Sequence, residues 1–165
     1  MKILVTGTPA TGKTSVAKAL AKKLKWKVIN EREFCIRKKI GTIEGKDREI
    51  AVPLKELERK LKAEIKGKKN LILEGHLLCE LKLPIDFIVL LRVSPKVLEK
   101  RLREKGYNEL KVLDNVFCEK INYCKEQLLQ NFPEKSVLEA RNGKGIKEIT
   151  QKILKEIKKL RKGKH

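Results

Sequence analysis

The stretch that most constrains this 165-residue sequence is Gly7-Thr8-Pro9-Ala10-Thr11-Gly12-Lys13-Thr14, which matches the phosphate-binding loop pattern G-x-x-x-x-G-K-[ST] at every specified position. A short β-branched and aliphatic run, residues 2–6, precedes it, and residues 15–24 follow with apolar side chains at helical spacing. Glycines let consecutive backbone N–H groups close around phosphate oxygens, and the N-terminus of the following helix adds partial positive charge. The sequence therefore predicts a strand, a phosphate-binding loop and a helix.

The side chains of this loop predict how a nucleotide would be held. Lys13 is expected to reach the β and γ phosphates, and Thr14 is expected to offer its hydroxyl to Mg²⁺, with Ser15 beside it in the first helical turn. The nucleotide-binding positions expected within the loop are Gly7, Ala10, Gly12, Lys13, Thr14 and Ser15. The alternative is a glycine-containing strand-to-helix turn that carries a surface lysine.

A second informative stretch is the apolar run at residues 70–76, which ends in Glu74 and His76. A carboxylate at the C-terminal end of a parallel strand faces the same crevice as the phosphate loop, so Glu74 is predicted to hold Mg²⁺ directly or through water. His76 would project from the same rim, where it could orient an attacking water or act as a base near neutral pH. The alternatives are a surface carboxylate and a loop histidine without a catalytic role. The predicted catalytic residues are thus Lys13, Glu74 and His76.

The remaining apolar pattern predicts the fold class. Residues 86–93 form a nearly continuous apolar run, which is typical of a parallel strand buried on both faces. Further strands are predicted at residues 25–30 and 136–140, and further helices at residues 53–65 and 146–160. We therefore expect a single domain over residues 1–165, with the three-layer α/β P-loop kinase fold and a parallel sheet of about five strands.

An interruption of this pattern at about residues 30–52 predicts an inserted segment. Its apolar positions are sparse, two glycines occur in it, and its centre is strongly polar. A P-loop kinase places its acceptor-binding insertion in this position, between the second and third strands, and the insertion must close over the second substrate. The segment is accordingly expected to be mobile and to bind the acceptor; a plain helical crossover with a loop is the alternative.

A basic segment after the fourth strand predicts a lid at about residues 104–114. Ser94 and Pro95 open a helix as its cap and first residue, Gly106 interrupts it, and a single helix is expected to resume from about residue 110 to 129. Arg101 and Arg103 crowd the end of the first helix, where cations could neutralise charge on a transferring phosphoryl group. A solvated basic face is the alternative interpretation.

The overall charge exceeds what one nucleotide site explains, because Lys and Arg total 41 against 21 acidic residues, for a net charge of +20. One interpretation is a solvating Lys/Glu-rich surface of the kind that heat-adapted proteins carry, and the other is a surface that meets RNA. The few aromatic residues argue against a dedicated base-stacking module. Without a long apolar run or a cleavable apolar segment at the N-terminus, a cytoplasmic protein with no membrane partner is expected.

Taken together, these motifs make the sequence similar to a known family, the atypical adenylate kinases and ATPases of the adenylate kinase isoenzyme 6 type, in their archaeal form. The resemblance covers nearly the whole chain. It is carried by the phosphate loop through Ser15, the Glu74-Gly75-His76 step, the strand exit Leu91-Arg92-Val93-Ser94-Pro95, and above all the lid Arg101-Leu102-Arg103-Glu104-Lys105-Gly106-Tyr107-Asn108-Glu109-Leu110-Lys111 with Asp114-Asn115. The family's acidic position before the histidine is commonly Asp, whereas this chain has Glu74.

The resemblance implies a broad-specificity nucleoside monophosphate kinase that uses ATP and Mg²⁺ with AMP as acceptor, hydrolyses ATP, and acts in maturation of the small ribosomal subunit and its 16S rRNA with ribosomal protein uS11. It also implies that Lys105, in the place where many relatives have Arg, contacts the nucleotide phosphates, although lysine lacks the bidentate fork. Arg37 is the candidate contact for the AMP phosphate. Two alternatives stay open: an ATP-dependent assembly factor with incidental kinase activity, and a P-loop kinase for another small acceptor.

Overall fold

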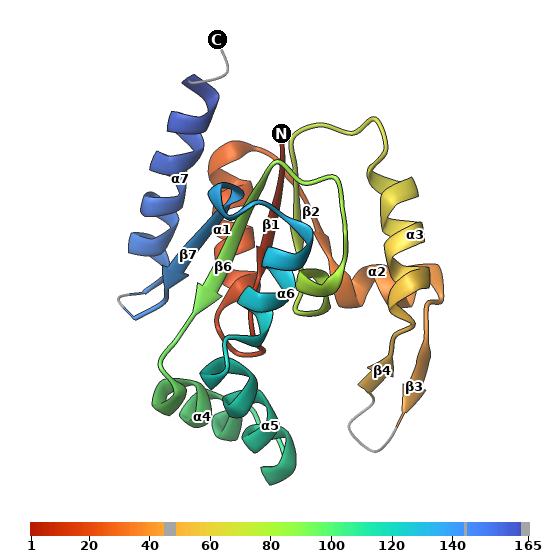
Figure 1. Cartoon of the computed structure of the whole chain (residues 1–165), viewed down its shortest axis with the longest axis vertical. Helices are drawn as coiled ribbons and strands as arrows, with labels where there is room; N and C mark the ends of the chain where they lie inside the picture. Colours follow the sequence, from red (N-terminus) through yellow and green to blue (C-terminus); the bar gives the residue numbers. More distant parts are fainter. Residues whose placement is uncertain (45–48, 144, 163–165) are drawn as a thin grey trace.

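A five-stranded parallel sheet forms the centre of the protein in the computed structural model, which describes residues 1–44, 49–143 and 145–162 (Figure 1). Its strands, in spatial order, are β2 (Lys27–Asn30), β5 (Leu71–Glu74), β1 (Lys2–Thr6), β6 (Phe87–Arg92) and β7 (Val137–Arg141). Strand β1 is central, and its Val5 pairs with Glu74 of β5 on one side and Val89 of β6 on the other. The predicted parallel sheet and the P-loop kinase fold are confirmed.

Helices cover both faces of the sheet. They are α1 (Lys13–Leu24), α2 (Glu31–Lys38), α3 (Leu54–Ile65), α4 (Pro95–Glu104), α5 (Glu109–Lys120), α6 (Tyr123–Asn131) and α7 (Ile146–Lys162), with two short 3₁₀ helices, η1 (Leu77–Glu80) and η2 (Glu134–Ser136). Because side chains alternate along a strand, Ile3 and Val5 of β1 pack with α1 and α7, whereas Leu4 packs in the opposite core with α3 and η1. This alternation produces the three layers.

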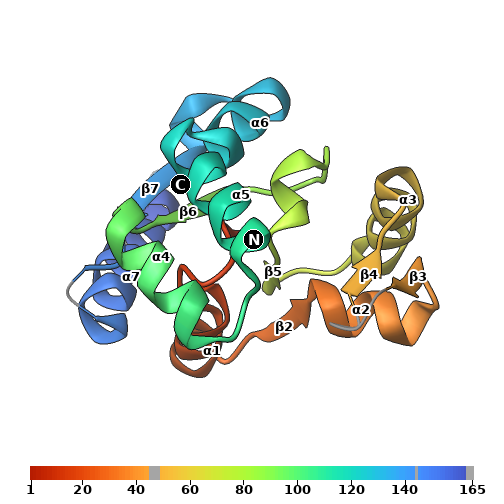
Figure 2. The ribbon, with the colours of Figure 1, turned by 90° about the horizontal axis from the view of Figure 1, so that it is seen from below.

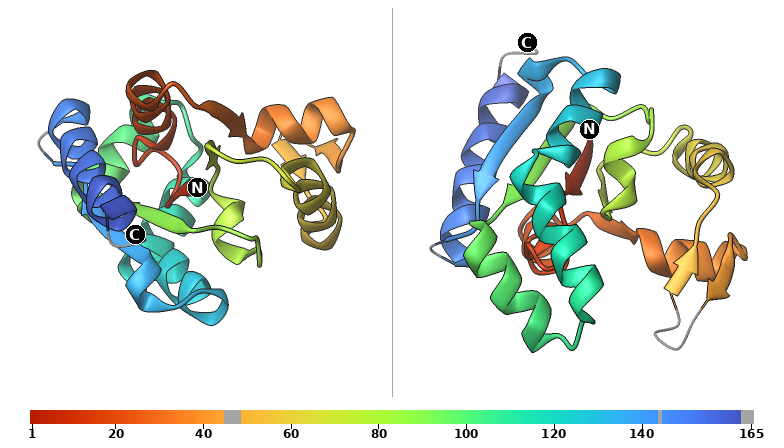
Figure 3. Two further views of the ribbon diagram at one scale, coloured as in Figure 1. Left: turned by 90° about the horizontal axis from the view of Figure 1, so that it is seen from above. Right: turned by 60° about the horizontal axis from the view of Figure 1, so that its bottom comes forward.

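The insertion after β2 is more regular than its sequence pattern indicates. Helix α2 begins directly at the end of β2, where the side chain of Asn30 caps it by accepting the backbone N–H of Glu33 at 3.0 Å. An antiparallel hairpin follows, β3 (Thr42–Glu44) and β4 (Glu49–Ala51), and then α3. Residues 45–48 belong to the polar run from which a mobile segment was predicted, and they lie outside the described residues. Figures 2 and 3 show the insertion to one side of the sheet, beyond β2.

The helices around the predicted lid begin as the sequence indicates and depart from the prediction after residue 120. The Ser94 side chain caps α4 by accepting the Val97 N–H at 3.4 Å, and Pro95 occupies the first helical position. Gly106, at φ +76°, lies just after the end of this helix. The single helix expected from residue 110 to 129 is wrong, because Asn122 adopts the left-handed conformation at φ +59° and separates α5 from α6. The break turns α6 back onto the core, where Leu128 is buried.

Helix α7 closes the fold against α1. Ile149, Ile153 and Ile157 are buried in the core that these helices share, and the Arg161 guanidinium lies 4.9 Å from the centre of the Trp26 ring. The residues beyond 162 lie outside the described residues. Among the helices of the described ranges, none combines the length and the apolar composition that crossing a membrane requires.

Candidate active site

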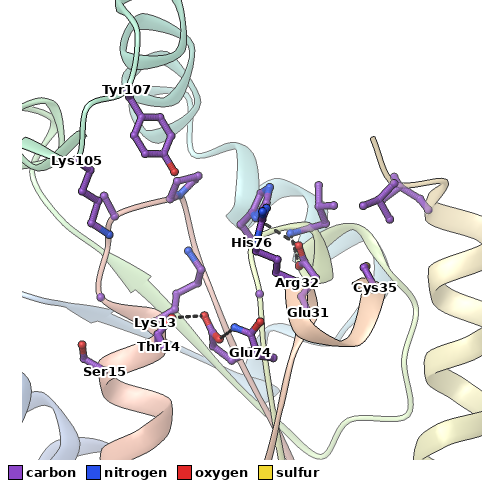
Figure 4. Close-up of a pocket in the computed structure, with 18 residues that line it drawn as sticks. Lys13, Thr14, Ser15, Glu31, Arg32, Cys35, Glu74, His76, Lys105 and Tyr107 are labelled. Atoms are coloured by element: carbon purple, nitrogen blue, oxygen red, sulfur yellow. Dashed lines mark hydrogen bonds and ion pairs between the residues drawn. The ribbon is translucent and has the colours of Figure 1, made fainter. Parts of the chain in front are cut away.

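A cavity of about 670 Å³ opens at the C-terminal ends of β1, β2 and β5. Its walls come from the phosphate loop and start of α1, the first turns of α2 and α3, the segment after β5, and the lid residues Lys105 and Tyr107 (Figure 4). Parallel strands direct their carboxyl ends to one edge of the sheet, so residues far apart in sequence meet there. The cavity is therefore the candidate active site.

Two glycines give the phosphate loop its shape. Gly7 has φ +142°, and a Cβ atom there would overlap the Leu91 carbonyl oxygen of β6. Gly12 has φ +99°, and its Cβ would lie 2.5 Å from Nδ2 of Asn142. That Nδ2 donates a hydrogen bond of 2.9 Å to the Thr11 carbonyl, so Asn142 ties the loop to the segment after β7. Glycine is required at both positions because the backbone conformation and the close neighbours exclude a side chain.

Lys13, the predicted phosphate ligand, is buried inside the loop. Its Nζ donates a hydrogen bond of 2.9 Å to the Thr8 carbonyl oxygen. Burial lowers the pKa of Lys13, and the nearby carboxylates of Glu74 and Glu31 oppose that shift. The buried Glu119 of α5 also holds the loop in place, because its carboxylate accepts a hydrogen bond from Thr8 Oγ1 at 2.6 Å.

Glu74 and Thr14, the predicted magnesium ligands, lie side by side. Thr14 Oγ1 donates a hydrogen bond of 2.9 Å to Glu74 Oε1, and Asn30 Nδ2 donates one to Glu74 Oε2. Glu74 is buried, with 3% of its surface exposed. The Thr14 hydroxyl and the Glu74 carboxylate, which meet near Lys13, are oxygen donors of the kind that Mg²⁺ prefers, so these residues fit the cation.

Glu31 is a second buried carboxyl in the cavity, which the sequence analysis did not identify. Its Oε2 accepts the Leu77 N–H at 2.9 Å, and its Oε1 lies 3.4 Å from His76 Nδ1. Burial raises the pKa of Glu31 to about 7, and the charge of Lys13 opposes this rise. A Cβ at Gly75 would overlap the Glu31 side chain, so the glycine after Glu74 makes room for the carboxyl. Glu74 was identified as a carboxyl at the C-terminal end of a strand, and the related signal of an acidic residue directly after a strand points to Glu31.

The predicted cations divide between those at the cavity and those away from it. Lys105 lines the cavity, and Arg101 Nη1 donates to the Ala10 carbonyl of the loop at 3.4 Å. Arg103 instead pairs with Glu99 and Glu109 on the lid, which differs from the predicted role at the phosphoryl group. Arg37 also departs from its prediction, because its guanidinium lies 5.5 Å from the centre of the Phe34 ring, beside a separate hollow next to β2.

The structure thus brings most of the predicted site residues together. Those that line the cavity are Ala10, Gly12, Lys13, Thr14, Ser15, Glu74, His76 and Lys105. Gly7 shapes the loop without lining the cavity, and Arg32 is the α2 cation that does line it. His76 is half-exposed at the rim.

Comparison with known proteins agrees with this fold. A family model described as an AAA domain matches residues 3–122. A protein of Pyrococcus furiosus named "Putative adenylate kinase" is 38% identical over 155 residues, which cover 93% of this chain and 82% of that protein. One of the same name from Thermococcus kodakarensis is 36% identical over 160 residues, covering 96% and 86%. Shikimate kinase from Aquifex aeolicus superposes with a TM-score of 0.66 at 16% identity, over 99% of both chains, and shares the fold.

These matches cover most of this chain and most of each archaeal relative, and the region that the family model matches contains the phosphate loop, Glu31 and Glu74. The chain therefore belongs to the AAA-domain P-loop family and groups with the archaeal proteins named "Putative adenylate kinase".

Proposed function

We propose that this protein transfers the γ-phosphoryl group of ATP to AMP and related nucleoside monophosphates with Mg²⁺. The observation that carries the proposal is the meeting of Lys13, Thr14 and Glu74 in one cavity whose far wall belongs to the insertion. The archaeal relatives, which are named for adenylate kinase activity, support the same acceptor. The cavity volume of about 670 Å³ lies within the usual range of small-molecule sites.

Each group would have a distinct role in the transfer. Lys13 and the loop amides would hold the donor phosphates, with Lys105 and Arg101 adding positive charge from the lid side. Mg²⁺ held by Thr14 and Glu74 would supply charge neutralisation on the β and γ phosphates. Because phosphoryl transfer needs little covalent help from the protein, positioning and charge supply most of the rate enhancement.

The test measures ADP formed from ATP and AMP by the purified protein with Mg²⁺. Lys13→Ala should lower turnover at least 100-fold, because it removes the cation nearest the transferring group. Lys18→Ala, an exposed lysine five residues further along α1, is the matched control and should leave turnover unchanged. Wild-type rates in the Lys13 variant, or no ADP from the wild-type protein, would refute the proposal.

A second candidate function is ATP-dependent assembly of the small ribosomal subunit, with ATP hydrolysis and binding of ribosomal protein uS11 or rRNA. The net charge of +20 favours it, because a polyanionic partner would account for the excess of lysine. ADP production should then rise when uS11 and small-subunit rRNA are added without AMP. If His76 positions a water, His76→Ala should lower hydrolysis more than transfer to AMP; equal losses would assign His76 no water-specific role.

A further inference from the structure

Glu31 is a carboxyl group that the proposed transfer to AMP does not use. It is the first residue of α2, lines the cavity, and is 6% exposed. The charged and titratable groups around it are Lys13 of α1, Glu74 of β5 and the neighbouring imidazole of His76. A monophosphate acceptor is already anionic and requires no base, and a second buried carboxylate beside Glu74 would repel it. The position therefore suits a different acceptor.

The surroundings of Glu31 hold its carboxyl in one orientation. The Leu77 N–H fixes Oε2 at 2.9 Å, and the missing side chain of Gly75 leaves the space that the carboxyl fills. On its other side Oε1 lies 3.4 Å from Nδ1 of the half-exposed His76. Figure 4 shows the side chains of Glu31 and His76 facing each other.

We propose that this protein also phosphorylates the hydroxyl group of a nucleoside, with Glu31 as the general base. The hydroxyl oxygen would attack the γ-phosphorus of ATP, the new O–P bond forming as the bond to the bridging oxygen breaks. The hydroxyl proton would go to the Glu31 carboxylate, and ADP would leave with the electron pair of the broken bond. This step rests on the proposed function, because it uses the same donor site around Lys13 and Thr14.

The chemistry of the cavity supports a nucleoside acceptor. The wall beside Glu31 is formed in part by apolar side chains of the insertion and of the segment after β5, namely Cys35, Val52, Leu54 and Leu77. An uncharged base and sugar suit such a wall better than a second phosphate does. The pKa of Glu31, raised by burial to about 7, also suits a group that must accept and release a proton near neutral pH.

The test offers each common ribonucleoside and deoxyribonucleoside, tritium-labelled, with ATP and Mg²⁺, beside the corresponding monophosphate. Tritium retained by an anion exchanger counts every phosphorylated product of a nucleoside, and ADP formation follows the monophosphates. Glu31→Gln keeps the shape and an acceptor for Leu77 but cannot take the proton. We expect it to lower nucleoside phosphorylation about 100-fold or more while transfer to AMP is kept or raised. Glu33→Gln, an exposed glutamate on the same helix, should change neither rate.

The outcomes separate this inference from the proposed function. If the wild-type protein phosphorylates AMP but no nucleoside, the inference is overturned and the proposed function stands. If Glu31→Gln phosphorylates a nucleoside at the wild-type rate, Glu31 is not the base and the inference is likewise overturned. Phosphorylation of a nucleoside that Glu31→Gln loses, in the absence of any transfer to AMP, would support the inference and the shared ATP site and refute AMP as the acceptor. Retained transfer to AMP shows that the variant is folded.

Discussion

Replacing Glu31 by glutamine should stabilise the protein above neutral pH. The carboxyl is buried, and its pKa rises from the ordinary value of 4.5 to about 7 in the folded protein. Below pH 4.5 the group is protonated in both the folded and the unfolded state and costs nothing. As the pH rises toward 7 the unfolded chain loses this proton first, so the folded state loses stability until Glu31 itself has ionised. The glutamine variant lacks this loss.

The size of the effect follows from the same pKa change. Each pKa unit is worth about 1.4 kcal/mol, so the rise from 4.5 to about 7 corresponds to about 3 kcal/mol of unfolding free energy. The unfolding free energy of Glu31→Gln relative to wild type should therefore increase by about 3 kcal/mol between pH 4.5 and pH 8. Taking the change between two pH values removes any constant effect of the amide, such as an altered bond to Leu77.

Urea unfolding at pH 4.5, 6 and 8, followed by circular dichroism, measures this difference directly. The exposed Glu33→Gln variant serves as control and should show no pH-dependent difference from wild type. A difference between Glu31→Gln and wild type that stays constant with pH would show that the Glu31 carboxyl is not held in a desolvated site, and the reasoning would fail. A buried carboxyl that serves function is expected to lower the unfolding free energy in this way, whereas one that serves stability is not.

Three further predictions concern the groups around the cavity. Gly75→Ala should destabilise the protein by about 1–3 kcal/mol, because its Cβ overlaps both the carboxyl and the Cβ of Glu31; Glu31→Gly, which removes both, should therefore cost less in the Gly75→Ala protein than in the wild type, and additive losses in thermal unfolding would contradict the contact. Asn142→Ala should cost about 1–3 kcal/mol and raise the KM for ATP, since the buried Thr11 carbonyl loses its donor; an unchanged KM would mean that this bond does not shape the loop. Glu74→Gln should raise the Mg²⁺ concentration needed for half-maximal turnover, and an unaltered Mg²⁺ titration would exclude Glu74 as its ligand.

Two parts of the candidate site were predictable from sequence because their signals are local. The loop from Gly7 to Thr14 combines a strand, glycines and a helix within a few residues, and Glu74 ends an apolar strand. The rule that parallel strands direct their carboxyl ends to one edge then places the two together, as the hydrogen bond from Thr14 to Glu74 shows. The central sheet was predictable for the same reason, since each strand carries its own apolar run.

Tertiary structure alone decided the contacts that support this site. Glu119 reaches Thr8 across 111 residues of sequence, and Asn142 reaches Thr11 across 131. The sequence places Glu31 directly after a strand, but its burial in the space beside Gly75 was decided by the fold. The break at Asn122 likewise reflects the packing of α6 on the core, which a helical pattern continuing through residues 110–129 does not reveal. Local sequence patterns determine the helices and strands, whereas contacts between residues distant in the chain are determined by how those helices and strands pack against one another.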